Sequence, residues 1–322
     1  MSAILHPDLP HFVAFGEAQT DLVRVAPDRW RSVCGGSPWQ VAVAMSALGQ
    51  LSAFGGAISQ DVFGAEIWQR SQDAHLDMRF IQQLPWPPLL AVVHELDPPR
   101  WFFVGQDSAD LHFRPEGLPA GWTRALRWAH FGSLGLVREP LAGRLLALAQ
   151  ALKSEGRRIS YAPSFRAPPM DSRYDDMLES MCRLADVIKV SDEDLRGLFR
   201  VSDHRSGLAQ IAAWNPGAWL LLTRGAAGAT LYHGEEECSG SPPPVRVVDT
   251  VGAGDAALAG LLDSLMREAG APAERHLRRA LAAGAAACAV PGFLPPAPAR
   301  LAQLEALAQA VEVVPGVFPR AS

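Results

Sequence analysis

Short apolar runs alternate with helical patterns along most of the chain, and this alternation limits the possible folds more than any other feature. Two helices are expected between the runs, one with Leu141, Leu145, Leu148 and Leu152 on one face and Gly156 at its end, and one over Met177 to Leu184. Strands separated by helices usually run parallel and are covered on both faces. The pattern therefore predicts an α/β fold with a central, mainly parallel sheet. Its expected strands are Phe12 to Phe15, Ala129 to Phe131, Arg158 to Tyr161, Val187 to Val190 and Trp219 to Thr223.

One region interrupts this alternation. Leu89 to Glu95 and Trp101 to Val104 are strand-like and are joined by Asp-Pro-Pro-Arg, which favours a turn rather than a helix. Leu22 to Val25 is another short apolar run. We expect one domain over residues 1–322, with a small β-sheet lid built from about residues 18–33 and 86–116 that folds over a cleft.

Composition excludes several functional classes. A chain of 322 residues with 48% hydrophobic content can bury a large core, and a net charge of −5 without a basic stripe argues against nucleic acid as a partner. The apolar stretch Ala280 to Val290 is shorter than the roughly 20 residues that span a bilayer, so a buried helix is expected and no membrane partner. Four dispersed cysteines without a C-x-x-C motif and a start that does not resemble a secretory signal favour a reducing cytoplasm.

Residues 249–256 read Asp-Thr-Val-Gly-Ala-Gly-Asp-Ala and precede a helical leucine pattern. This order places a glycine turn, a carboxylate and a helix N-terminus at one point. Backbone N–H groups of Gly252, Ala253 and Gly254 can hold a phosphate there, and Asp255 can take a proton from an attacking hydroxyl. The chemistry indicated is phosphoryl transfer; alternatively, Asp255 only stabilises the helix N-terminus electrostatically.

A second helix start follows Gly35 and Gly36. Ser37 is expected as the N-cap, Pro38 at the first helical position, and Gly49 after the last turn. The glycine pair would let a ligand approach the backbone closely, or it forms only a tight turn into the helix.

These segments resemble the two signatures of the PfkB/ribokinase family of carbohydrate kinases. The first is Gly35 to Gly49 and the second is residues 249–255, and other family-like pieces occur in order at 16–21, 130–133, 189–195 and 223–228. The resemblance covers nearly the whole chain and is greatest to bacterial fructokinases and 2-keto-3-deoxygluconate kinases. It implies a ribokinase-like three-layer α/β fold and ATP-dependent phosphorylation of a small sugar, with fructose as the first candidate.

The resemblance also implies roles for individual residues. Asp255 would be the catalytic base, with the N–H groups of residues 252–254 as an anion hole. Asp21, which alone would suit a surface turn, would bind sugar hydroxyls. The other sugar-binding residues would be Gly35, Gly36, Gln40 and Arg166, and the nucleotide would contact Ser191, Thr223, Gly225 and Gly228. The last three also suit a simple hairpin.

Two positions concern metal ions. Ser191 and Asp194 occupy the family's N-x-x-E motif, so Asp194 is expected to bind Mg²⁺ through water; helix capping at the start of Asp192 to Phe199 is the alternative. The family also suggests a monovalent cation such as K⁺ near Asp249 and Val251.

Departures from the family pattern leave the substrate open. Gln40 replaces the usual Asn, and Ala-Pro-Ser-Phe-Arg at 162–166 replaces Asp-Pro-Asn-x-Arg, so that Arg166 either contacts the substrate or braces its loop. Alternative substrates are 2-keto-3-deoxygluconate, ribose and nucleosides. A nucleotide- and sugar-binding regulator with weak catalysis is a further alternative.

The glycine turn also fits G-x-G-x-x-A, the loose fingerprint of a dinucleotide-binding oxidoreductase. That hypothesis would place Asp255 against a pyrophosphate and requires an acidic residue on a second strand about 20 positions later. Here that distance falls in Glu268 to Glu274, a helical or loop segment. The family resemblance further suggests a homodimer formed through the lid strands, whose apolar edge needs cover.

Overall fold

The computed structural model describes residues 9–96, 99–165, 170–292, 298–308 and 310–315. Their largest element is a ten-stranded sheet with the order β14-β13-β12-β11-β10-β9-β8-β1-β4-β5. Strands β11 to β5 in this order run parallel, and β12, β13 and β14 are antiparallel. The strands are β1 (Phe12–Phe15), β4 (Ser52–Ser59), β5 (Ile81–Leu84), β8 (Trp128–Gly132), β9 (Arg158–Ala162), β10 (Val187–Ser191), β11 (Trp219–Thr223), β12 (Ala229–His233), β13 (Glu236–Gly240) and β14 (Ala310–Pro315).

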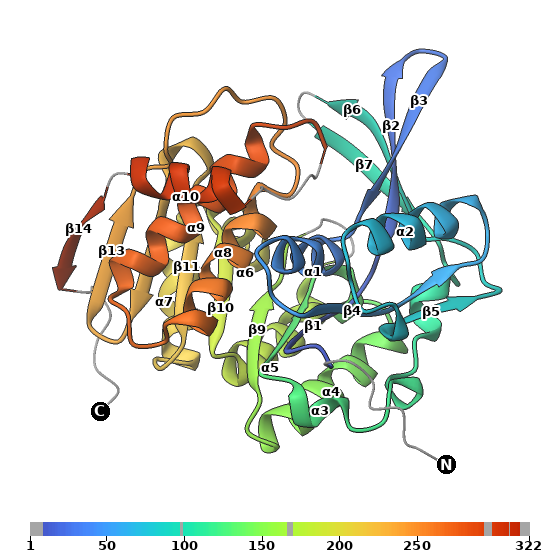
Figure 1. The fold of residues 1–322 in the computed structure, drawn as a ribbon, viewed down its shortest axis with the longest axis horizontal. Helices are drawn as coiled ribbons and strands as arrows, with labels where there is room; N and C mark the ends of the chain where they lie inside the picture. The colour runs from blue at the N-terminus through green and yellow to red at the C-terminus, as the bar shows by residue number, and fades with distance from the viewer. Residues whose placement is uncertain (1–8, 97–98, 166–169, 293–297, 309, 316–322) are drawn as a thin grey trace.

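Helices cover both faces of this sheet (Figure 1). Side chains from α1, α2, α8, α9 and α10 pack with one face, and those of α3 to α7 pack with the other. The helices are α1 (Ser37–Ala47), α2 (Val62–Asp73), α3 (Trp122–Ala125), α4 (Leu141–Ser154), α5 (Asp175–Leu184), α6 (Asp192–Phe199), α7 (His204–Trp214), α8 (Ala253–Arg267), α9 (Ala273–Cys288) and α10 (Pro298–Leu307).

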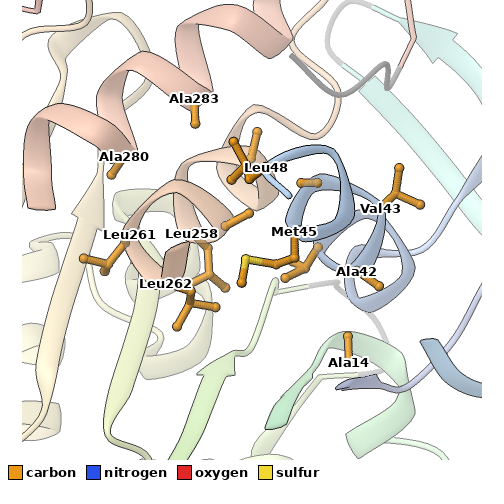
Figure 2. Close-up of a cluster of buried hydrophobic side chains, with 14 of the residues drawn as sticks. Ala14, Ala42, Val43, Met45, Leu48, Leu258, Leu261, Leu262, Ala280 and Ala283 are labelled. Atoms are coloured by element: carbon orange, nitrogen blue, oxygen red, sulfur yellow. The ribbon is translucent and has the colours of Figure 1, made fainter. Parts of the chain in front are cut away.

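Strand β1 shows why both faces need cover. Phe12 and Ala14 belong to one core cluster, whereas Val13 and Phe15 belong to the other, because successive side chains of a strand point to opposite faces. Figure 2 shows Ala14 below Met45 of α1. Leucines of α8 and alanines of α9 lie on the other side of Met45. The missing side chain of Gly260 on α8 lets α9 approach closely: a methyl group on Gly260 would lie 2.7 Å from the Arg279 carbonyl oxygen.

A separate four-stranded sheet forms the lid, with the order β3-β2-β6-β7. Its strands are β2 (Gln19–Ala26), β3 (Arg29–Gly35), β6 (Leu90–Leu96) and β7 (Pro99–Val104). Figure 1 shows the lid projecting beyond the main sheet next to α2. Residues 109–117, which the lid was expected to include, form short 3₁₀ turns, and Leu111 and Phe113 there are buried in the main core.

The predicted α/β fold with a mainly parallel sheet and a lid is confirmed. The expected hairpin, the buried helix ending near Val290 and the helix over Asp192 to Phe199 are all present. Strand β3 had no apolar signal, because most of its side chains are exposed. Within the described part of the chain, none of the helices combines the length and the apolar character required to cross a membrane.

Candidate active site

A cavity of about 1340 Å³ lies where the main sheet, the amino end of α8 and the lid meet. Its wall includes residues that follow β9, β10 and β11 at their carboxyl ends, the edge where parallel sheets commonly bind ligands. The predicted residues that line it are Ser191, Asp194, Thr223, Gly225, Gly228, Gly252, Ala253, Gly254 and Asp255. Folding therefore brings together the phosphate and nucleotide residues expected from separate segments of the sequence.

The amino end of α8 opens onto this cavity. Gly252 is the N-cap in a left-handed conformation with φ of 73°, a backbone angle that glycine adopts without strain. The Ala253 N–H donates to the Thr250 carbonyl oxygen at 3.3 Å, so this predicted anion-hole donor is partly engaged within the protein. Gly254 and Asp255 follow in the first turn, where backbone N–H groups have no partner inside the helix.

The Asp255 carboxylate accepts a hydrogen bond from Ser37, which in turn contacts Ser164. Ser37 donates its hydroxyl hydrogen to Asp255 Oδ1 at 2.6 Å, and Ser37 Oγ lies 3.1 Å from Ser164 Oγ. Because Ser37 has only one hydroxyl hydrogen, Ser164 must be the donor of the second bond. Ser164 is buried and has φ of 47°, an uncommon backbone angle for serine. Two segments distant in sequence thus fix the orientation of this carboxylate.

The predicted N-cap role of Ser37 is wrong. Gly36 is the N-cap of α1, and no side chain caps the helix. A methyl group on Gly36 would lie 2.5 Å from the Glu17 carbonyl oxygen, so the absent side chain allows close packing against the chain after β1. The Ser37 hydroxyl instead bonds Asp255, across 218 positions of sequence.

The predicted sugar residues lie beside the cavity rather than in its wall. Asp21, Gly35, Gly36 and Gln40 are all described, and none of them lines it. A methyl group on Gly35 would lie 2.7 Å from Asp21 Oδ2, so the two residues are adjacent, and Gln19 donates to Asp21 Oδ1 at 2.7 Å. The segment Gly35-Gly36 leads directly to Ser37 and thereby to Asp255. Arg166 lies outside the described residues.

Both carboxylate oxygens of the buried Asp194 accept backbone hydrogen bonds. Its Oδ1 accepts the Phe165 N–H at 2.7 Å, its Oδ2 accepts the Ser191 N–H at 2.7 Å, and Ser191 completes a capping box for α6. Burial raises the pKa of Asp194, but the nearby Lys189 charge and these N–H groups outweigh burial and hold the pKa below its ordinary value. The capping alternative is confirmed, and Asp194 remains ionised.

The hairpin expected around Thr223 to Gly228 is present as β11 and β12. Gly228 has φ of 90°, and a methyl group there would lie 2.0 Å from the Gly240 carbonyl oxygen, so only glycine fits. Thr223, Gly225 and Gly228 nevertheless line the cavity. The hairpin interpretation is therefore confirmed, and the nucleotide role of these residues stays a prediction.

Asp249 lies next to the helix start and outside the cavity wall. Its two carboxylate oxygens accept the Val251 N–H and the Gly292 N–H, each at 3.0 Å. Over the described ranges, no group of three or more His, Cys, Asp or Glu side chains is arranged to hold a metal ion.

Several residues of the cavity wall carried no predicted role. His94, Arg100 and Trp101 come from lid strands. Neither the strand-like pattern around His94 and Trp101 nor the turn pattern at Arg100 gives a sign that they face a cavity. Lys189 stands in the segment that resembles the family, but no role was assigned to it. Ser37 is not among the residues that line the cavity and was predicted only as an N-cap; the Gly-Gly pair before it was the one signal that could have found its contact with Asp255.

Comparison with known proteins connects this geometry to an activity. The family described as "pfkB family carbohydrate kinase" matches residues 10–300. The chain belongs to the pfkB family of carbohydrate kinases. A fructokinase of Klebsiella pneumoniae is 34% identical over 257 residues, which cover 78% of this chain and 82% of the relative. A fructokinase of Escherichia coli is 30% identical over 272 residues, covering 82% and 87% of the two chains.

Solved structures of fructokinases share the fold of this pfkB-family kinase. The fructokinase of Xylella fastidiosa with bound ATP has a TM-score of 0.81 at 26% identity, and the match covers 92% of this chain and 98% of that one. The fructokinase of Vibrio cholerae with fructose, ADP and calcium bound has a TM-score of 0.78 at 26% identity, covering 94% and 99%. The protein is a sugar kinase with a ribokinase-like fold.

Proposed function

We propose that this kinase transfers the γ-phosphoryl group of ATP to a hydroxyl group of fructose or a closely similar small sugar. The observation that carries the proposal is the position of the Asp255 carboxylate. It lies at the amino end of α8, accepts a hydrogen bond from Ser37, and lines the same cavity as the predicted nucleotide residues Thr223 to Gly228. The fructokinase names of the relatives support fructose as the first candidate.

The proposed reaction needs positioning more than basicity. Asp255 accepts the proton of the sugar hydroxyl while the hydroxyl oxygen forms a bond to the γ-phosphorus and the bond to the β-γ bridging oxygen breaks, releasing ADP. A loose transition state requires proton removal only late, so an oriented carboxylate is sufficient. Backbone N–H groups at the start of α8 stabilise the charge on the transferred group.

Metal ions fit this site mainly through the nucleotide. Asp194 is buried with the Lys189 cation 3.6 Å from it, and Glu193 is the exposed carboxylate in the same wall, so Mg²⁺ would be held mostly by phosphates and water. We also propose a monovalent cation near Asp249 and the Val251 backbone. A carboxylate has about four acceptor positions, so the two N–H groups on Asp249 leave room for a cation. Comparing rates in potassium and tetramethylammonium salts tests it.

Replacing the carboxylate is the direct test of the proposed role. Asp255→Asn should lower kcat for the best sugar by about 10²- to 10⁴-fold, because the amide cannot take the proton. The control is Asp263→Asn in the same helix. Asp263 is buried, and its carboxylate accepts hydrogen bonds from Gln50, Arg267 and Arg279. A parental rate in folded Asp255→Asn would contradict the proposal.

Substrate choice requires a panel of acceptors. ADP release should be measured with ketoses, aldoses, nucleosides and keto-deoxy sugar acids. The acids are included because Arg100 and His94 line the same cavity and can attract a carboxylate. A higher kcat/KM for a sugar acid than for fructose would replace fructose as the substrate. ADP release with none of them would favour the regulator.

We further propose a homodimer formed through the lid. By strand register, Leu22, Trp30, Val92, Phe102 and Val104 share one lid face, opposite the face that carries Asp21 and Trp101. Trp30 is 46% exposed and Phe102 is 52% exposed, an apolar surface that a second copy would cover. Light scattering should give twice the chain mass, and Trp30→Lys with Phe102→Lys should give the monomer.

The compartment is part of the same proposal. All four cysteines lie in the described part of the chain and are unpaired, as expected where thiols stay reduced. A reducing, ATP-containing cytoplasm suits this proposed reaction.

A further inference from the structure

Lys189 occupies an unusual position at the end of β10. Its ammonium group lies in the cavity wall, and a methyl group built on Gly254 would be 3.0 Å from Lys189 Nζ. The side chain is only 9% exposed. A buried cation therefore lies directly against the first turn of α8.

This placement is electrostatically unfavourable for the protein alone. The N-terminus of a helix carries a partial positive charge, and anions rather than cations are stabilised there. Among the described residues, the carboxylate partner of Lys189 is Asp194, whose Oδ2 lies 3.6 Å from Nζ, longer than a hydrogen bond. A buried ammonium group needs hydrogen-bond acceptors, and Asp194 at this distance does not satisfy it.

Asp194 nevertheless fixes where the ammonium group lies. The carboxylate is itself held by the Phe165 and Ser191 N–H groups, one from the loop after β9 and one from the start of α6. Lys189 is thus drawn toward a rigid anion on one side, while its Nζ borders the cavity on the other.

We propose that Lys189 binds the phosphate groups of the nucleotide donor, between the amino end of α8 and Asp194. A phosphate at this point would supply acceptors that the described residues do not give the ammonium group, and it would also face the N–H groups of Gly254 and Asp255. The assignment rests on the proposed kinase function for the identity of the anion. Asp194 acts here as a positioning residue for Lys189 rather than as a ligand of the nucleotide.

Binding measurements separate this role from catalysis. Titration calorimetry should compare ATP, ADP and adenosine on the parent, Lys189→Met and Lys189→Arg. Lys189→Met keeps the length of the stem but removes the charge, and it should weaken ATP binding by about 10- to 100-fold while adenosine binding changes less than about twofold. Lys189→Arg, which keeps the charge, should retain more ATP affinity than Lys189→Met.

A double variant guards against misfolding. Lys189→Met alone leaves the Asp194 charge buried without its cation, which is destabilising. Lys189→Met with Asp194→Asn removes both charges, and Asp194→Asn alone is the matched control. If the folded double variant binds ATP as tightly as Asp194→Asn does, or if adenosine and ATP lose affinity equally, the assignment is wrong. If the parent protein phosphorylates no sugar, the proposed function is wrong, but the comparison of ATP and adenosine binding remains valid.

Discussion

The two sheets of this protein bury their faces in different ways. The main sheet has helices on both faces, and all four residues of β1 are buried. The lid sheet is less covered: β3 has exposed residues over most of its length, and Phe102 of β7 is 52% exposed. The main sheet is therefore stabilised by helices of the same chain, whereas the stability of the lid depends on whether a partner covers its exposed face.

This difference lets one sheet hold the site in place while the other moves. A rigid, doubly covered sheet can hold Asp255 and the α8 N-terminus in fixed geometry, and positioning of this kind gives much of the rate in phosphoryl transfer. A lid with few contacts can open and close over the cavity that His94, Arg100 and Trp101 line. The chain passes between the two sheets near Glu17, which lies between β1 and β2, and near Ser37, which follows β3. These two connections join the rigid sheet to the lid.

The strongest test of this contrast substitutes one strand phenylalanine in each sheet. Phe15 is fully buried, and its ring stacks on Phe131 with centroids 5.2 Å apart. Phe15→Ala should lower the free energy of unfolding by about 3–5 kcal/mol, and Phe102→Ala by less than about 0.5 kcal/mol in the monomer. Chemical denaturation of both variants measures this. Equal losses in dilute protein would remove the distinction; a Phe102→Ala loss that grows with protein concentration would indicate the lid dimer.

The second test concerns the connection from β1 to the lid. Glu17 is buried and accepts the Gly135 N–H at 2.8 Å; desolvation raises its pKa from 4.5 to about 7. The folded protein thus keeps a proton that the unfolded chain loses, so stability falls as the pH rises from 4.5 through 7. The loss is roughly 3 kcal/mol.

Glu17→Gln removes this titration and still offers an acceptor to Gly135. Relative to the variant, the parent should lose stability between about pH 5 and about pH 8 in denaturant unfolding experiments. A constant difference between the two proteins across this range would show that Glu17 ionises as readily in the fold as in the unfolded chain.

The smallest expected effect lies at the other connection, where β3 leads into α1. Ser37→Ala removes the hydrogen bond to Asp255 and should lower kcat about tenfold with little change in the KM for ATP. Ser46→Ala, which removes a hydrogen bond from the same helix to Ala74, is the control. Matching kinetics for the two alanine variants would show that Ser37 does not position Asp255.

Much of the fold could be predicted because its cause is local. Buried strands such as β11 need apolar residues throughout, and the capping residues before residues 192–199 predict the helix there. The glycine turn before α8 was predictable for the same reason, since φ of 73° at Gly252 restricts the residue type. Strand β3 was not, because an exposed strand carries no pattern that distinguishes it from a polar loop.

The sequence by itself determined the α/β architecture, the glycine turn before α8 and the candidate base Asp255, because each depends on residues within a few positions of one another. Only the tertiary structure decided that Ser37 holds Asp255 rather than capping α1, that Asp194 is occupied by backbone N–H groups, and that Lys189 lies against the first turn of α8. These are contacts between side chains or backbone groups on different elements. Their partners are set by how the strands and helices pack, and no local pattern records that packing.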